Sequence, residues 1–225
     1  MPETVNILIP VRLPDWWREL AIERYAKHTS KETDVVGIDL TPEQQEQLTD
    51  DRLPGFLLEN ARVQEAVRAD AHIIDCFSDP GLALLSQELT GPVVGVGQAG
   101  LWFAHGRFHR FAVITSERGS AERIRGNAAR SSLDHRLEDV LSIDIPAGEI
   151  PGASDRAFNA VAELAQGLSD RVDGLVLGCT ELVEFTPRLE TRLAGGRKAR
   201  IRVVNPIAVA IRLAELRILL ERARS

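Results

Sequence analysis

The chain contains two cysteines, Cys76 and Cys179, and both lie among turn-forming residues rather than inside an apolar run. A thiolate can remove a proton from a carbon atom next to a carbonyl group, and a thiol on the opposite face of that carbon can return one. A facing pair of thiols would therefore invert a stereocentre. The two segments are Asp75-Cys76-Phe77-Ser78-Asp79 and Gly178-Cys179-Thr180-Glu181.

Other roles for the cysteines remain open. Both could be buried core residues, because Cys is among the most buried residue types, although Val, Ile and Leu already fill the strand faces here. A redox disulfide is a further option, but the chain has no Cys-x-x-Cys spacing. Each cysteine opens a turn into a helix, at Pro80-Gly81 and at Thr180-Glu181, where backbone N–H groups and the helix dipole favour a thiolate.

Short apolar runs alternate with amphipathic stretches of helix length, which is typical of a parallel sheet with crossover helices. The second four predicted strands begin 106, 106, 103 and 109 residues after the first four, which indicates an internal duplication. The predicted strands are residues 5–9, 35–40, 71–75, 92–96, 111–115, 141–145, 174–177 and 201–204. The corresponding helices are 15–28 with 119–130, 55–69 with 154–168, and 81–89 with 181–193.

We therefore predict an α/β fold of two similar lobes, each a four-stranded parallel sheet flanked by helices and related by a pseudo-twofold repeat. The first lobe is residues 1–100, the second is residues 101–205, and a helix over residues 206–225 packs back on the first. Cys76 follows the third predicted strand of its lobe, and Cys179 follows the third of the other after Gly178. Ligands of open α/β sheets bind at the carboxyl ends of the strands, so both thiols are predicted at a ligand site. If the lobes face each other, so do the thiols.

The composition narrows the classes of partner. The chain has 225 residues, 44% hydrophobic and 27% charged, and a formal net charge of −6, which argues against a nucleic-acid binder. Neither a basic leader nor an apolar run of about 20 residues is present, so we expect a cytoplasmic protein and no membrane partner. In a reducing compartment both cysteines would stay thiols.

A glycine motif offers a competing interpretation. Gly95-Val96-Gly97-Gln98-Ala99-Gly100 matches the dinucleotide-binding pattern and follows a predicted strand. Only residues 101–110 separate it from the next strand, too few for a crossover helix with its turns, and Gly106 interrupts them. We therefore expect no cofactor. His105 and His109 are four residues apart but lack a third partner, so we expect no metal either.

The segment Cys76-Phe77-Ser78-Asp79-Pro80-Gly81-Leu82 resembles the first cysteine motif of the hydantoin and allantoin racemases of the aspartate/glutamate racemase superfamily. Leu177-Gly178-Cys179-Thr180-Glu181-Leu182 is similar to the second motif of that superfamily. The likeness spans nearly the whole chain. It implies an isomerase with a site between two lobes, cofactor-independent two-base catalysis by Cys76 and Cys179, a small-molecule substrate and a homo-oligomer.

The resemblance also implies which residues bind the substrate, with Thr115, Ser116 and Thr180 in loops that hydrogen-bond its carbonyl groups. Two positions depart from the family pattern. The stretch Ile9-Pro10-Val11-Arg12 stands where hydantoin racemases usually carry Asn-Pro-Asn followed by Ser or Thr, and Gln98 stands where they often carry Glu. Arg12 could bind a carboxylate or another anion, or be a solvated loop residue. The predicted substrate-binding residues are Pro10, Val11, Arg12, Phe77, Ser78, Asp79, Gln98, Thr115, Ser116, Gly178, Thr180 and Glu181.

The leading hypothesis is a racemase or epimerase of a cyclic ureide of hydantoin or allantoin type. The enzymatic alternatives within the superfamily are an acidic amino-acid racemase, a maleate-type cis–trans isomerase and an arylmalonate-type decarboxylase. An alternative from another class is a non-catalytic protein that binds a small anion through Arg12.

Overall fold

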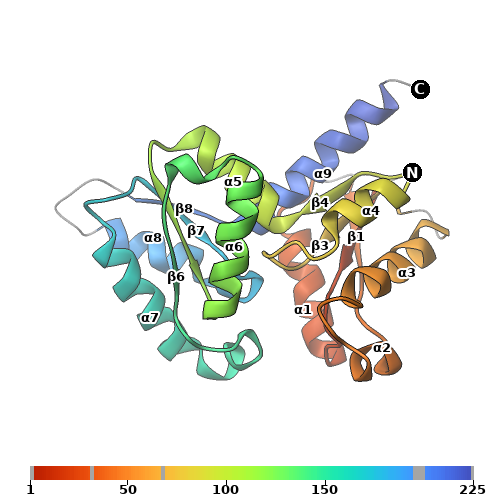
Figure 1. The fold of residues 1–225 in the computed structure, drawn as a ribbon, viewed down its shortest axis with the longest axis horizontal. Coiled ribbons are helices and arrows are strands. Elements are labelled where there is room, and N and C mark those ends of the chain that lie inside the picture. Colours follow the sequence, from red (N-terminus) through yellow and green to blue (C-terminus); the bar gives the residue numbers. More distant parts are fainter. Residues whose placement is uncertain (1–2, 31–32, 67–68, 195–200, 224–225) are drawn as a thin grey trace. The chain divides into compact units, whose positions relative to one another are not determined.

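The computed structural model describes residues 3–30, 33–66, 69–194 and 201–223, and it contains two four-stranded parallel sheets flanked by helices (Figure 1). The strand order is β2-β1-β3-β4 in the first sheet and β6-β5-β7-β8 in the second. The two sheets therefore repeat one topology, and the predicted fold class is confirmed.

The boundaries of most elements lie close to the predicted ones. The strands are β1 Glu3–Leu8, β2 Thr33–Ile38, β3 Ala71–Ile74, β4 Val93–Gly95, β5 Phe111–Thr115, β6 Leu137–Ser142, β7 Gly174–Leu177 and β8 Arg202–Val204. The α-helices are α1 Asp15–Ala26, α2 Pro42–Glu46, α3 Leu53–Ala66, α4 Leu82–Glu88, α5 Val96–Arg107, α6 Arg118–Arg130, α7 Ser154–Gly167, α8 Thr186–Ala194 and α9 Pro206–Arg222. Residues 67–68 and 224–225, at the ends of two predicted helices, lie outside the described residues.

Strand β6 is the one strand whose predicted position is clearly wrong. It runs over Leu137–Ser142 rather than residues 141–145. As an edge strand of its sheet it buries only Val140 fully, so its sequence is not a continuous apolar run. The apolar residues that suggested a strand come after it, where Ile143 N and Ile145 N donate to Thr115 O and Ser116 O.

The prediction that the segment after the glycine motif is too short for a helix was also wrong. Strand β4 ends at Gly95, and α5 begins at the next residue, so Gly97 and Gly100 lie inside the helix. Helix α5 joins β4 of one sheet to β5 of the other and need not fold back on its own sheet, which is why twelve residues suffice. A phosphate-binding turn needs a glycine loop between strand and helix, and these residues do not form one.

The predicted helix over residues 181–193 is divided in two. A 3-10 helix, η4, covers Thr180–Phe185, and α8 begins at Thr186. Pro187 stands in the first turn of α8, where its missing N–H costs no hydrogen bond, so it marks the start of a new helix. The short helix α2 was not predicted, although Thr41 and Gln44 form a capping box at its start.

The chain divides into two compact units, residues up to Val96 together with Ile207 onward (unit 1) and Gly97–Pro206 (unit 2). Helix α9 belongs to unit 1, where Glu215 accepts a hydrogen bond from Ser30 N and Arg217 donates to Val93 O. None of the helices in the described part of the chain is both long and apolar enough to cross a bilayer.

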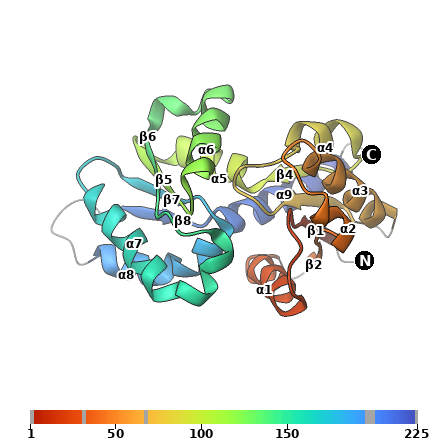
Figure 2. The same ribbon diagram turned by 60° about the horizontal axis from the view of Figure 1, so that its bottom comes forward.

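In each unit, helices cover both faces of the sheet. In unit 1, α3 and α4 bury Phe56, Leu57 and Leu85 against Leu8 and Ile74. The opposite face meets α1, whose Ile22 lies against Gly37 of β2. In unit 2, α7 and α8 pack on one face of the sheet and α6 on the other (Figure 2). Such double coverage explains why the central strands read as continuous apolar runs.

A buried polar cluster crosses the first sheet. Asn6 Nδ2 lies 3.2 Å from His72 Nδ1, and both side chains are fully buried. An amide donor on Nδ1 leaves the ring proton on Nε2, which faces Glu65 Oε1 at 3.9 Å. Burial lowers the pKa of His72, and the charge of Glu65 only partly opposes this. His72 is therefore neutral in the folded chain at neutral pH.

We expect His72 to make folding weaker in acid. The pKa of His72 in the folded chain lies below the ordinary value of 6.5, so at pH values between the two the unfolded chain binds a proton more readily than the folded chain. The stability tied to this residue is present above pH 6.5 and is lost as the pH falls from 6.5 toward the lowered pKa. Urea unfolding of the native chain and of His72→Gln at pH 7.5 and 5.5 measures it. Equal pH dependence in the two proteins would contradict this account.

Candidate active site

Cys76 and Cys179 occupy the same place in the two units. Strand β3 ends at Ile74 and β7 ends at Leu177, so each cysteine is the second residue after the corresponding strand of its sheet. The residue between the strand and the cysteine donates an equivalent backbone hydrogen bond in each unit. Asp75 N donates to Leu8 O at 2.9 Å in unit 1, and Gly178 N donates to Ile114 O at 2.7 Å in unit 2. The repeat thus extends to the residues that could carry chemistry.

The turn after β3 presents Cys76. Asp79 N donates to Cys76 O at 3.0 Å, which closes the turn, and Cys76 Sγ lies 3.1 Å from Ser78 Oγ. Asp79 has a left-handed backbone with φ of 50°. Its carboxylate packs on Gly95, where an added Cβ would lie 2.4 Å from Asp79 Cγ. Gly95 is therefore a glycine because the acidic side chain needs that space.

The electrostatic setting of Cys76 differs from the prediction that a helix start would favour its thiolate. Burial raises the pKa of the Cys76 thiol, and the charges of Asp79 and Asp75 raise it further. The hydroxyl and backbone N–H of Ser78 oppose this by stabilising the thiolate. Helix α4 begins only at Leu82, six residues beyond the cysteine, so its dipole acts from a distance.

Substitutions of the two neighbours of Cys76 should shift its pKa in opposite directions. Ser78→Ala removes a donor to the thiolate and should raise the pKa, whereas Asp79→Asn removes a negative charge and should lower it. The measurement is the pH dependence of iodoacetamide alkylation in a Cys179→Ser background, where Cys76 is the one remaining cysteine. Shifts of the same sign in both variants would show that these contacts do not control the thiol.

Asp75 brings in a tyrosine that sequence reasoning missed. The Tyr25 hydroxyl of α1 donates to Asp75 Oδ1 at 2.7 Å, and the tyrosine is fully buried. Burial, together with the charge of Asp75, raises the pKa of Tyr25 well above its ordinary value, so the phenol stays protonated. It anchors the residue before Cys76. Tyr25 is the only tyrosine in the sequence, which could have drawn attention to it. The sequence gives no sign, however, that it contacts Asp75, 50 positions away.

The turn after β7 presents Cys179 at the start of η4, and Leu182 N donates to Cys179 O at 3.0 Å. Cys179 is 9% exposed and packs in the core that α7 and α8 form with the sheet. The Thr115 hydroxyl donates to Gly178 O at 2.7 Å, and an added Cβ on Gly178 would lie 2.4 Å from Val113 Cγ1. The backbone before Cys179 is thus fixed from both sides.

The predicted binding residues differ in burial and in the elements that carry them. Thr115 ends β5 rather than lying in a loop, is fully buried, and donates its hydroxyl proton to Gly178 O. Ser116 and Phe77 are also buried, with 3% and 4% exposure. Gln98 lies in α5 rather than in a glycine loop. Ser78, Asp79, Thr180 and Glu181 remain half-buried beside their cysteines.

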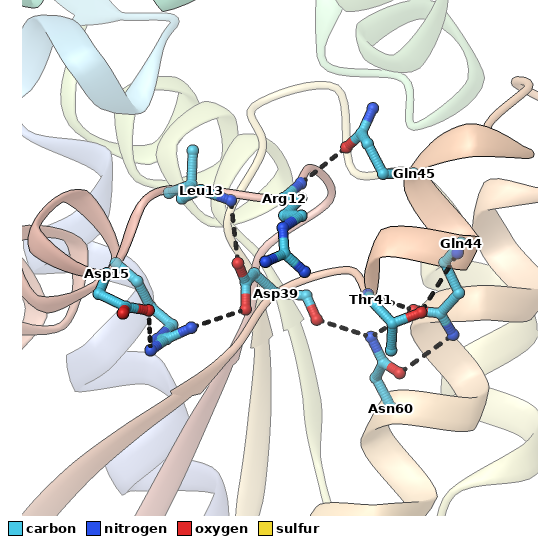
Figure 3. A network of polar contacts seen from close by, with 9 residues as sticks. Arg12, Leu13, Asp15, Asp39, Thr41, Gln44, Gln45 and Asn60 are labelled. Atoms are coloured by element: carbon cyan, nitrogen blue, oxygen red, sulfur yellow. Dashed lines mark hydrogen bonds and ion pairs between the residues drawn. The ribbon is translucent and has the colours of Figure 1, made fainter.

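The loop after β1 is held by the neighbouring segment after β2 (Figure 3). Arg12 N donates to Gln45 Oε1 at 2.8 Å, and Leu13 N donates to Asp39 Oδ2 at 2.9 Å. Asp39 Oδ1 accepts from Arg18 at 3.2 Å. Pro10 and Val11, which complete the predicted set in unit 1, lie in the same loop. β1 and β3 are neighbours in the sheet, so this loop and the Cys76 turn leave it side by side.

In the residues that the structure describes, no group of three or more His, Cys, Asp or Glu side chains is placed to hold a metal ion. Each cysteine turn offers one thiol, a hydroxyl or carboxyl neighbour, and the backbone N–H groups of the turn that follows.

The family model described as Asp/Glu/Hydantoin racemase matches residues 21–214, most of the chain. The chain belongs to this family. The match includes both cysteine turns, and the resemblance inferred from their sequences is confirmed.

The chain is similar in sequence to a hydantoin racemase and in fold to racemases of two kinds. It is 30% identical over 166 residues to a hydantoin racemase of Rhizobium meliloti, covering 72% of the chain and 66% of that protein, just under two thirds. An allantoin racemase from Klebsiella pneumoniae has the same fold, with a TM-score of 0.85, 19% identity, and coverage of 97% of the chain and 89% of that structure. A glutamate racemase from Bacillus anthracis is similar in fold with a TM-score of 0.69 and 18% identity, covering 98% of the chain and 82% of that structure.

Proposed function

We propose that this protein is a cofactor-independent racemase or epimerase of a hydantoin- or allantoin-type cyclic ureide, with Cys76 and Cys179 as its two acid–base residues. One observation carries the proposal, namely the equivalent placement of the two cysteines, each two residues beyond the corresponding strand of a repeated sheet. Inversion of a stereocentre is a reaction with two equivalent halves, and a repeated thiol supplies one base for each half.

In the proposed reaction, one cysteine is a thiolate and the other a thiol. The thiolate takes the proton from the ring carbon beside the carbonyl group, and the electron pair moves onto the carbonyl oxygen as an enolate. The opposite thiol then donates its proton to the other face of the carbon. The two cysteines end with exchanged protonation states, and the product leaves. The backbone N–H of Thr180, the first residue of η4, is a suitable donor for the enolate oxygen.

In this scheme Cys76 is the proton donor in the resting protein, which agrees with the raised pKa of its thiol. A thiol that stays protonated near neutral pH is ready to donate, and it becomes the base only after it has given up its proton. The enantiomer whose proton leaves toward Cys179 would then be the one that the resting protein accepts directly.

The substrate class rests on the named relatives, a hydantoin racemase in sequence and an allantoin racemase in fold. Two flanking groups of carbonyl type acidify the ring carbon–hydrogen bond in such compounds, which suits a thiolate base. An acidic amino-acid racemase is the second candidate, since a glutamate racemase shares the fold. A decarboxylase of arylmalonate type needs only one cysteine, so it would not explain why the chain has a second cysteine at the equivalent position.

The test is a panel assay on single compounds. Optical activity and proton NMR would follow enantiopure 5-substituted hydantoins, allantoin, aspartate, glutamate, maleate and an arylmalonate, each against a blank without protein. We expect enzyme-dependent loss of optical activity for the cyclic ureides alone. Turnover of an amino acid, isomerisation of maleate or release of carbon dioxide would move the assignment to the corresponding alternative. Thermal stabilisation by an anion without turnover would favour a binding protein.

A further inference from the structure

We infer that Arg12 selects a substrate that carries an anionic group, a ureide ring with a carboxylate on the side chain of its stereocentre. The inference rests on the proposed function, because it places that substituent beside a ring held at Cys76. It adds a specificity-determining residue that the reaction itself does not require.

The position of Arg12 follows from the pairing of the first sheet. Strands β1 and β3 are parallel neighbours with Leu8 opposite Ile74, and Asp75 N donates to Leu8 O at the last rung. Neighbouring strands lie about 4.8 Å apart, so the chain after β1 and the chain after β3 leave the sheet next to each other. Arg12 is four residues beyond β1, and Cys76 is two residues beyond β3.

The backbone of Arg12 is held firmly, while its side chain is available. Its N–H donates to Gln45 Oε1, and the next residue, Leu13, is held by Asp39 (Figure 3). Both oxygens of Asp39 are occupied, by Leu13 N and by Arg18. Within the described residues the guanidinium of Arg12 forms no ion pair. It is exposed, and its positive charge helps to lower the pKa of the exposed Glu43 carboxyl.

The loops at the carboxyl edge of the first sheet carry more negative than positive charge. The segments that lead from strand ends to the next helix are residues 9–14, 39–41 and 75–81 in unit 1. They contain three carboxylates, Asp39, Asp75 and Asp79, and Arg12 is their one basic residue. An anionic substituent would be repelled by Asp75 and Asp79 next to Cys76 and attracted toward Arg12, while the nearby Arg18 already pairs with Asp39 and Asp15.

The guanidinium sets the chemistry of the ligand. Its planar array of N–H donors matches a carboxylate through two parallel hydrogen bonds, and its charge persists at any working pH. The held backbone reduces the ordering that binding would otherwise require. A carboxylate a few carbon atoms from the ring is therefore the group that this loop recognises.

The experiment compares 5-(2-carboxyethyl)hydantoin with 5-(2-carbamoylethyl)hydantoin, which has the same shape but is neutral. The native chain should racemise the acid with a kcat/KM about 10- to 100-fold higher, as expected for hydrogen bonds to a charged group. Arg12→Gln should bring that ratio close to one, mainly by raising KM for the acid, and Arg12→Lys should give an intermediate ratio. Arg62→Gln removes an exposed positive charge from α3 of the same unit and should keep the native ratio.

The outcomes distinguish a failure of the Arg12 assignment from a failure of the racemase proposal. Equal rates for acid and amide in the native chain, or a preference that survives in Arg12→Gln, would overturn the assignment of Arg12 and leave the racemase proposal standing. If neither compound loses optical activity but allantoin or another cyclic ureide of the panel does, the assignment of Arg12 is overturned alone. If no cyclic ureide loses optical activity, the racemase proposal is overturned and this inference with it.

Discussion

Replacing either cysteine by serine should lower kcat for racemisation of the preferred ureide by about 10²–10⁴-fold, the range that a positioned acid or base contributes. Cys76→Ser and Cys179→Ser should be similarly inactive in both directions, because each direction uses both residues, one as base and the other as acid. Serine keeps the size of the side chain, but its hydroxyl is far less acidic than a thiol. Polarimetry from each enantiomer in turn measures the effect.

A loss of activity in these variants has to be separated from a loss of fold. Cys179 is buried in the core of unit 2, so Cys179→Ser carries some cost in stability, whereas the partly buried Cys76 at the edge of its core should tolerate serine better. Thermal unfolding of both variants provides the control. A folded Cys76→Ser protein that racemises at the native rate would exclude the two-base mechanism.

Gly178→Ala should be the most damaging substitution outside the cysteines. The added Cβ would lie 2.4 Å from Val113 Cγ1 and 3.3 Å from Ile114 O, while bonds to Ile114 and Thr115 hold the backbone in place. Relief requires the end of β7 to move away from β5, which carries Cys179 with it. We expect a stability loss of about 1–3 kcal/mol, as for other overpacked sites. We also expect an activity loss of about 10²-fold, because a shift near 1 Å misaligns a reacting group.

Gly167→Ala is the matched control for that variant. It lies at the end of α7 in the same unit, and an added Cβ there meets nothing within 4 Å. Urea unfolding and racemisation of the two variants should therefore diverge. If Gly178→Ala behaves like Gly167→Ala in both measurements, the tight contact around Gly178 does not hold Cys179 in place.

The central strands could be predicted from the sequence because burial on both faces leaves them as plain apolar runs. The bounds of β5 and β7 were predicted to the residue for this reason. The edge strand β6 carries Glu138 and Asp139 and was misplaced. Helix α5 was missed because its glycines suggested a loop, and the sequence does not state that this segment joins two sheets.

For the candidate site, residue type and spacing located both cysteines but not what surrounds them. The partnerships of Tyr25 with Asp75 and of Thr115 with Gly178 join residues 50 and 63 positions apart. Such contacts depend on which strands are neighbours, and periodicity alone does not determine that order. The predicted preference of Cys76 for its thiolate failed for a related reason, because the burial that raises its pKa most comes from packing.

The most direct test of two-base racemisation by Cys76 and Cys179 is the position of deuterium at early times. A single enantiomer of the preferred ureide would be incubated with the native chain in deuterated buffer and stopped at low conversion, and the two enantiomers would be separated and analysed by mass spectrometry, with spontaneous exchange subtracted. We predict deuterium in the product enantiomer and hydrogen in the recovered substrate, because the proton leaves to one thiol and the deuteron arrives from the other. Equal deuterium in both enantiomers would indicate a single base and would contradict the assignment of both cysteines.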